Sequence, residues 1–319
     1  MRVLLALGGN AMTNADGRAR PEDQIAAAEV AMEAVAGLVA EGVDIVVTHG
    51  NGPQVGNLLV KNELAAAVVP PVPLDWCGAQ TQGTLGFVLM NALDAALARR
   101  GIDQRCATVV TRTRVDRDDA GFTTPTKPIG RFLPAEEAAV LVEHGETWED
   151  RGEKGWRRVV ASPEPLEVID APAVHALVEA GFVVIANGGG GIPVVRRADG
   201  SLEGVEAVID KDLGAALLAR DLKADVLIIA TDIPNVLVGY GTPEARPLRQ
   251  VTQRELREHA AQGEFAAGSM GPKVEALLRF IEHQGSHAVI CALPDIAEAV
   301  HGEAGTVVAA DDDASPHDS

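Results

Sequence analysis

Three lysines stand in sequence contexts that would restrict the direction of their side chains. Lys127 lies in a stiff loop flanked by prolines, and Lys273 follows a Gly-Pro pair. Lys211 lies between Asp210 and Asp212, either of which could pair with it and orient it. Three ammonium groups around one phosphate chain could neutralise its charge and position the reacting groups without a covalent nucleophile. Alternatively, each lysine is a surface residue and the Asp-Lys-Asp run is a solvated helix start.

Three predicted strands end in glycine together with asparagine. Such turns leave backbone N–H groups exposed and place no bulky side chain in the way, which suits an oxyanion held by several donors. A tight strand exit would need the same residues. The residues concerned are Gly8, Gly9 and Asn10, then Gly50, Asn51 and Gly52, and finally Asn187 and Gly188.

Other motifs that carry chemistry are absent from the sequence. It contains neither a P-loop nor a dinucleotide-binding Gly-x-Gly-x-x-Gly, and no Ser-His-Asp set or His/Cys cluster indicates hydrolysis or a protein-bound metal. His49 could act as a base, but we expect it to support the adjacent turn by hydrogen bonding. Asp232 follows a predicted strand, where it could meet a nucleotide or metal, or equally cap a helix.

Strands and helices alternate along most of the chain, which predicts an α/β protein with a mainly parallel sheet covered on both faces. A further turn signal at Asp199-Gly200 predicts a hairpin, and so does Asp118-Asp119-Ala120-Gly121. The predicted strands are an apolar run beginning at residue 3 and the segments 43–48, 106–111, 182–186, 225–230, 287–292 and 306–309. The predicted helices are 21–41, 54–67, about 75–100, 171–180, 206–220, 252–261 and one that opens at 268–273.

The pattern changes between residues 112 and 165. Charged residues become more frequent, Trp148 and Trp156 appear, and buried-strand runs stop. We expect both tryptophans to pack inside a small excursion from the main sheet, which could be a lid. The sequence therefore predicts one domain over 1–310 with a protruding lid subdomain inserted at 112–165, followed by an acidic disordered tail at 311–319.

Composition excludes several classes of function. The 319 residues are 47% hydrophobic and carry a net charge of −19, which argues against nucleic-acid binding. Cys77, Cys106 and Cys291 are too far apart for a metal site or a disulfide framework, so we expect reduced, mostly buried thiols. No apolar run approaches the ~20 residues of a membrane span, and the N-terminal run is too short for a secretory signal. We therefore expect a cytoplasmic protein.

Seven segments, in order along the chain, resemble the carbamate kinase branch of the amino-acid kinase family. The Pro-Thr-Lys-Pro-Ile-Gly loop and the Asp-Lys-Asp stretch are specific to this branch, whereas the Gly-Gly-Asn turn is shared more widely. The segments are Leu-Gly-Gly-Asn-Ala (7–11), Thr-His-Gly-Asn-Gly-Pro-Gln-Val-Gly (48–56), Cys-Gly-Ala-Gln-Thr-Gln-Gly (77–83), Pro-Thr-Lys-Pro-Ile-Gly (125–130), Asn-Gly-Gly-Gly-Gly-Ile-Pro-Val (187–194), Val-Ile-Asp-Lys-Asp-Leu (208–213) and Gly-Ser-Met-Gly-Pro-Lys-Val (268–274).

The resemblance implies a three-layer αβα sandwich with an open sheet, a homodimer and a protruding subdomain around Lys127. It implies reversible phosphoryl transfer between ATP and carbamate, with Mg²⁺ carried by the nucleotide rather than by protein ligands. In the reverse direction, ADP and carbamoyl phosphate give ATP and carbamate, which yields ammonia and CO₂. The family often runs this way, on carbamoyl phosphate from arginine or purine breakdown.

By the same resemblance, the site residues have assigned roles. Gly8, Gly9, Asn10, Gly50 and Asn51 would surround the transferred phosphoryl group and carbamate. Lys127 would reach in from the lid, while Lys211, oriented by Asp210, and Lys273 would neutralise the phosphates. The residues expected to border the nucleotide are Thr231, Asp232, Val236, Tyr240, Met270 and Gly271, together with Lys211 and Lys273.

Two departures from the family pattern and two alternative functions remain open. Arg131 stands where a proline is expected and Pro234 where a less constrained residue is expected, which affects the lid shape and the nucleotide contacts. The protein could be another acid kinase of the same fold that acts on an amino-acid carboxylate. It could also be a non-catalytic regulator that binds nucleotide or carbamoyl phosphate.

Overall fold

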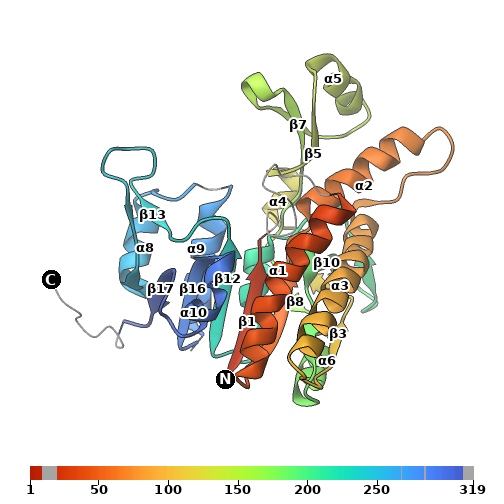
Figure 1. Cartoon of the computed structure of the whole chain (residues 1–319). Helices are drawn as coiled ribbons and strands as arrows, with labels where there is room; N and C mark the ends of the chain where they lie inside the picture. The colour runs from red at the N-terminus through yellow and green to blue at the C-terminus, as the bar shows by residue number, and fades with distance from the viewer. Residues whose placement is uncertain (9–19, 267, 284, 312–319) are drawn as a thin grey trace.

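The structure, a computed structural model, describes residues 1–8, 20–266, 268–283 and 285–311 (Figure 1). Gly9 and Asn10 lie outside the described residues, and so does the acidic tail beyond Asp311. Within the described chain, no helix is both long and apolar enough to span a membrane. Cys77 and Cys291 are buried free thiols, and Cys106 is a half-buried one.

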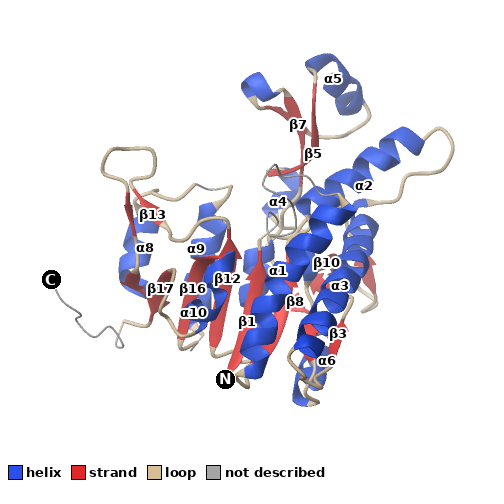
Figure 2. Ribbon diagram, in the orientation of Figure 1, coloured by secondary structure: helices blue, strands red, loops and turns tan. Residues whose placement is uncertain are grey.

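Within the described residues, the main sheet has eight strands, and β1 lies near its centre between β12 and β2 (Figure 2). Every neighbouring pair is parallel except β16 with β17. The predicted mainly parallel α/β sheet is therefore confirmed. In spatial order the strands are β15 (Gln250–Thr252), β17 (Thr306–Ala309), β16 (His287–Ala292), β12 (Val226–Thr231), β1 (Arg2–Leu7), β2 (Asp44–His49), β9 (Val183–Ile185) and β3 (Cys106–Thr108).

Helices cover both faces of this sheet, because alternate residues of each buried strand point to opposite sides. In β1, Leu4 and Ala6 pack into one hydrophobic cluster, whereas Val3, Leu5 and Leu7 pack into the other. The first cluster includes α6 (Ala171–Glu179), α7 (Lys211–Asp221), α8 (Gln253–Ala261) and α9 (Met270–Glu282). The second includes α1 (Pro21–Ala40), α3 (Leu74–Arg99) and α10 (Ile296–Val300). The three layers expected from the sequence are therefore present.

Capping side chains set the start of two helices, one predicted five residues too early and the other within one residue. The helix predicted from residue 206 begins at Lys211, because the Asp210 carboxylate accepts hydrogen bonds from the N–H groups of Asp212 and Leu213. The α8 helix begins after Thr252, which forms a reciprocal capping box with Glu255. The position of the first cap matters for the site, because it fixes which way the Asp-Lys-Asp side chains point.

A second, four-stranded sheet joins the two ends of the excursion to the body. It contains the predicted hairpin at Asp199-Gly200, formed by antiparallel β10 and β11. The segment predicted to make a hairpin at Asp118–Gly121 does not: there Asp119 caps a short helix, α4 (Ala120–Thr123), by accepting a hydrogen bond from the N–H of Gly121. In spatial order the strands are β11 (Leu202–Gly204), β10 (Ile192–Arg196), β4 (Arg112–Arg114) and β8 (Glu167–Val168).

The part of the excursion that protrudes from the body, which we call the protrusion, is a three-stranded antiparallel sheet with one helix (Figure 1). Trp148 is buried in its small core and Trp156 packs against that core, as expected. Arg131 forms an ion pair of 3.1 Å with Glu63 of α2 (Gly52–Ala65), which ties the protrusion to the body. The protrusion consists of β5 (Lys127–Leu133), α5 (Ala135–Glu143), β6 (Trp148–Asp150) and β7 (Trp156–Val160).

Candidate active site

A cavity of about 820 Å³ lies at the edge of the sheet where β1, β2 and β12 end. Residues following these strands line it, and so do the start of β5 in the protrusion and the loop before α9. Lys127, Lys211 and Lys273 are all among the lining residues. Elements far apart in the sequence therefore bring the three predicted lysines to one cavity.

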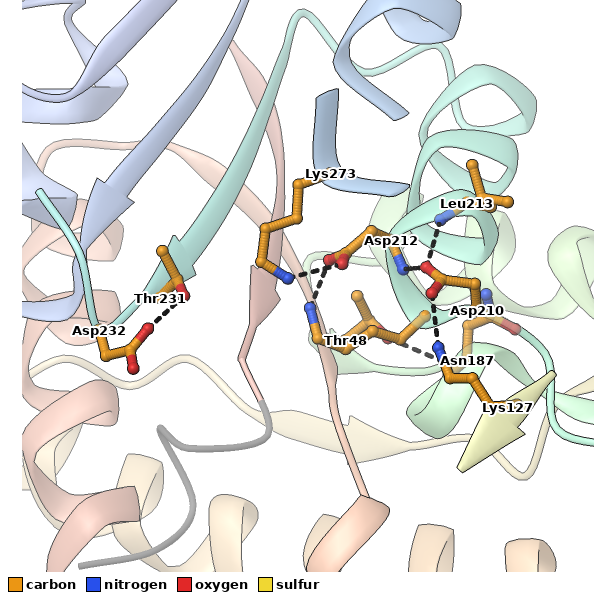
Figure 3. Close-up of polar contacts among 10 residues, drawn as sticks. Thr48, Lys127, Asn187, Asp210, Asp212, Leu213, Thr231, Asp232 and Lys273 are labelled. Atoms are coloured by element: carbon orange, nitrogen blue, oxygen red, sulfur yellow. Dashed lines mark hydrogen bonds and ion pairs between the residues drawn. The ribbon is translucent and has the colours of Figure 1, made fainter. Parts of the chain in front are cut away.

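Two aspartates at the start of α7 hold the lysines (Figure 3). Asp210 is the N-cap: its Oδ1 accepts from the N–H of Asp212 at 2.9 Å, while its Oδ2 accepts from Nζ of Lys127 at 2.7 Å. Asp212, in the first turn, accepts from Nζ of Lys273 at 2.9 Å and also from Nζ of Lys211. The carboxylate that contacts Lys211 is thus Asp212. The residues alone had left both aspartates open, and the family resemblance had assigned this role to Asp210.

The Asp212 carboxylate is the most buried charge of this cluster, with 3% of the residue exposed. Burial alone would raise its pKa, but the nearby Lys211 and Lys273 ammonium groups outweigh burial and lower the pKa to about 2. Burial lowers the pKa of Lys211, and the Asp212 carboxylate opposes that shift. From the sequence, Asp212 was one of two possible partners of Lys211, and its contact with Lys273 was not anticipated. The Asp-x-Asp spacing across a helix start was the signal that could have identified its central position.

Three helices begin at the wall of this cavity. Gly52 opens α2, Lys211 opens α7 and Met270 opens α9, and each of these residues lines the cavity. The N-terminus of a helix carries a partial positive charge and unpaired N–H groups, so it favours phosphate. At α7, however, the Asp210 carboxylate already accepts from the N–H groups of Asp212 and Leu213, and at α9 the N–H of Gly271 donates to Ala266. Among the described residues it is therefore mainly the three lysines that offer positive charge to an anion in the cavity.

The glycines that follow β1 and β2 line the cavity differently from what the sequence suggested. The N–H of Gly8 donates to the carbonyl of Ala230 at 2.8 Å, and the N–H of Gly50 donates to that of Leu7 at 3.0 Å. These two amides therefore continue the hydrogen bonding of the sheet and are not free for a ligand. Gly8, Gly50, Asn51 and Gly52 nevertheless lie on the cavity wall.

The third glycine-containing turn, at Asn187 and Gly188, mainly packs the end of β9 against neighbouring elements. Asn187 is fully buried and left-handed (φ 56°); its Nδ2 donates to the carbonyl of Gly214 at 3.0 Å and its Oδ1 accepts from Thr113 at 3.1 Å. A Cβ on Gly188 would lie 2.4 Å from Nε2 of His49, so a side chain there would clash. Neither Asn187 nor Gly188 lines the cavity, whereas Gly189 does.

His49 supports the turn after β2, as expected. It is 1% exposed, and its Nδ1 lies 3.1 Å from the carbonyl oxygen of Gly50. Because a carbonyl only accepts, Nδ1 must carry the proton. Burial lowers the pKa of His49 to about 4, with a smaller opposing effect from this hydrogen bond. The ring is therefore neutral near pH 7.

The residues expected near the nucleotide divide into two groups. Thr231, Asp232, Tyr240 and Met270 line the cavity, and Thr231 donates a hydrogen bond to Asp232 at 2.9 Å. Asp232 follows β12 and is not the N-cap of any helix in the described part of the chain. Two further residues are placed off the cavity wall. Val236 is fully buried and donates its N–H to Thr306, and Gly271 donates its N–H to the carbonyl of Ala266.

Sequence reasoning missed the loop before α9. Glu264, Phe265 and Ala266 line the cavity, and so does Leu237 beside the buried Val236. No motif marked this loop beyond the glycines at its ends, Gly263 and Gly268. The loop connects α8 with α9, whereas the sequence analysis looked for ligand-binding residues mainly at the ends of strands.

A model of the amino acid kinase family matches residues 1–292 of this chain. The chain belongs to the amino acid kinase family. The carbamate kinase of Thermococcus kodakarensis is 44% identical to it over 311 residues, covering 96% of this chain and 98% of the other. The carbamate kinase of Pyrococcus furiosus is 43% identical over 312 residues, covering 96% and 98% respectively.

A solved member of the family has the same fold over almost its whole length. The carbamate kinase of Giardia lamblia, in a structure bound to AMP-PNP, superposes with a TM-score of 0.91 and is 39% identical, covering 97% of this chain and 98% of that one. The αβα fold and the family resemblance inferred from the sequence are therefore confirmed.

Proposed function

We propose that this protein is a carbamate kinase, which transfers a phosphoryl group reversibly between ATP and carbamate. The observation that carries the proposal is the convergence of Lys127, Lys211 and Lys273 on one cavity. It is supported by relatives named carbamate kinase at 43–44% identity along nearly the whole chain. In the direction of ATP synthesis, the substrates are ADP and carbamoyl phosphate.

In this proposal the two substrates occupy opposite sides of the cavity. ADP lies along Thr231, Asp232, Tyr240 and Met270, and carbamoyl phosphate lies between Lys127 and the turn that contains Asn51. An oxygen of the β-phosphate of ADP attacks the phosphorus, and the bond from phosphorus to the carbamate oxygen breaks. Lys211 and Lys273 neutralise the charge on the moving phosphoryl group, so no covalent enzyme intermediate is needed.

Mg²⁺ enters the proposal bound to the nucleotide. Among the described residues, no group of three or more His, Cys, Asp and Glu side chains is arranged to hold a metal ion. Asp210 and Asp212 line the cavity, but both already accept hydrogen bonds from lysines. We expect the phosphate oxygens of the nucleotide to be the ligands of the ion, whose role would be to shield their charge.

We further propose the homodimer implied by the family resemblance. On α3, Trp76 and Phe87 are exposed to 60% and 59%, and burying these two large apolar side chains against a second subunit would be favourable. Light scattering after size-exclusion chromatography would measure the mass in solution. A mass of about one chain, 33.2 kDa, at micromolar concentration would contradict the dimer.

The function is tested by mixing the purified protein with ADP, Mg²⁺ and carbamoyl phosphate and measuring ATP by luciferase. We expect ATP formation that requires all three additions. If no ATP forms but ATP phosphorylates an acidic amino acid, the protein is the other acid kinase. If nucleotide binds, as measured by calorimetry, but no phosphoryl group is transferred to any acceptor, the protein is a regulator.

A further inference from the structure

A short segment of α3, Cys77–Gly83, contacts the site although none of its residues lines the cavity. Thr81 and Gln82 are 2% and 3% exposed. In the part of the chain that the structure describes, the Gln82 side chain forms hydrogen bonds only with backbone groups. Its Nε2 donates to the carbonyls of Gly188 and Thr111 at 3.0 and 3.1 Å, and its Oε1 accepts from the N–H of Thr111 at 2.8 Å. Thr81 instead holds a side chain that does line the cavity, that of Asn51.

The hydrogen bonds of Thr81 determine which way the Asn51 amide faces. The Thr81 hydroxyl donates to the carbonyl of Gly78 at 2.7 Å. Because the hydroxyl has only one proton, the Thr81 oxygen can act only as an acceptor toward the neighbouring amide. That amide contact is Nδ2 of Asn51, at 2.9 Å. The chain of donors therefore runs from Asn51 through Thr81 to Gly78 and assigns the nitrogen and oxygen of the amide.

A close backbone approach keeps the amide in this position. Gly189 has φ +67°, and a Cβ built on it would lie 2.2 Å from Nδ2 of Asn51. The backbone at Gly189 thus lies against the amide group, while Thr81 holds its nitrogen. The same Cβ would lie 2.7 Å from Oδ1, so the backbone packs against both ends of the amide. Among the described residues, Oδ1 accepts no hydrogen bond, and Asn51 lines the cavity, which leaves this oxygen as an acceptor that a ligand could use.

We propose that Thr81 is a positioning residue that selects an acyl phosphate bearing an amine, by fixing Oδ1 of Asn51 as a hydrogen-bond acceptor for that amine. The inference rests on the proposed function and adds the basis of its substrate choice. Carbamoyl and acetyl phosphate have nearly the same shape, but the first carries NH₂ where the second carries CH₃. An acceptor at this point pairs with the N–H of the first and is left unpaired by the second.

Removing the Thr81 hydroxyl should reduce this selectivity. Without it, the Asn51 amide can turn by 180° and offer Nδ2 where Oδ1 was needed. The quantity that reports this is the ratio of kcat/KM for carbamoyl phosphate to kcat/KM for acetyl phosphate, each measured with ADP. A general loss of folding or of nucleotide binding lowers both values and leaves the ratio unchanged.

The experiment compares Thr81→Val, which replaces the hydroxyl with a methyl group, with Thr81→Ser, which keeps the hydroxyl. We expect Thr81→Val to lower the ratio at least ~10-fold, which corresponds to about 1.4 kcal/mol, with the KM for ADP unchanged. Thr81→Ser should retain the wild-type ratio. Thr84→Val is the matched control, because Thr84 is exposed one turn further along the same helix.

Thr81→Ala is measured alongside, since it removes the hydroxyl without adding a methyl group, and it gives the ratio if Thr81→Val does not fold. An unchanged ratio in the folded hydroxyl-free variants overturns the inference, and so does a wild-type protein that uses both acyl phosphates equally well. A wild-type protein that makes no ATP from carbamoyl phosphate overturns the proposed function itself, which is a different result.

Discussion

Lys127 in the protrusion and the lysine pair in the body reach the same cavity in different ways. Lys211 and Lys273 share the Asp212 carboxylate, and their side chains are only 14% and 15% exposed. Lys127 stands on β5, pairs with Asp210 and keeps 32% of its side chain exposed. The pair is held by the body alone, whereas the position of Lys127 depends on how the protrusion sits over the cavity.

This difference suggests two distinct roles for lysine in the site, transition-state stabilisation and substrate binding. Charges fixed in a water-poor site stabilise a transition state strongly, because they need little reorganisation during the reaction. A half-exposed lysine on a protruding strand is better suited to binding the substrate from one side. We therefore expect substitutions in the body to lower turnover and substitutions in the protrusion to affect the use of one substrate.

The largest effect is expected from Lys211→Ala. It removes a buried ammonium group that the proposed mechanism uses to neutralise the moving phosphoryl group, so kcat should fall by ~10³-fold. Initial rates of ATP formation at saturating substrates measure it. Lys61→Ala, at an exposed position on α2, is the matched control. Unchanged turnover in the Lys211 variant would remove that residue from the mechanism.

Asp212→Asn should follow, with kcat lowered by ~10²-fold because Lys211 and Lys273 both lose the group that orients them. The free energy of unfolding in urea should also fall by about 3 kcal/mol, since two buried cations lose their counter-charge. Asp210→Asn is the comparison, because asparagine still caps a helix well. Equal losses of turnover in the two variants would contradict a distinct role for Asp212.

A smaller and more selective effect is expected from Lys127→Ala. If Lys127 makes the charge-assisted contact with carbamoyl phosphate that we propose, losing it should raise the KM for this substrate by ~10-fold. The affinity for ADP, measured by calorimetry, should change much less. If ADP affinity falls while carbamoyl phosphate use is retained, the assignment of Lys127 to the substrate side is wrong.

The smallest effect on turnover is expected at His49, which shapes the body side without touching the cavity. Its pKa of about 4 in the folded protein lies below the unfolded value of 6.5, so its contribution to stability is complete above pH 6.5 and lost as pH falls through about 4. That contribution is about 3 kcal/mol. Urea denaturation between pH 7 and 4 should show a weaker pH dependence in His49→Gln, and no such change in His144→Gln.

Particular residues show how far the sequence could be interpreted. The apolar runs of β1, β12 and β16 predicted buried strands, because a strand covered on both faces needs apolar side chains at consecutive positions. The turn at Asn187 and Gly188 was interpreted as one that could hold an oxyanion or simply as a tight strand exit; the structure places Gly188 against His49, and only the neighbouring Gly189 lines the cavity. A glycine in the sequence indicates that another group approaches the backbone closely. Whether that group is a ligand or a side chain depends on elements elsewhere in the chain.

The sequence by itself determined the family, the layered sheet and the three lysines, since each depends on local periodicity or on short motifs in a fixed order. Only the tertiary structure decided which carboxylate each lysine contacts. Lys127 is 83 residues from Asp210, and Lys273 is 61 residues from Asp212. The exact residue at which α7 begins points those two neighbouring aspartates in different directions, and ion pairs between distant segments exist only after the chain has folded.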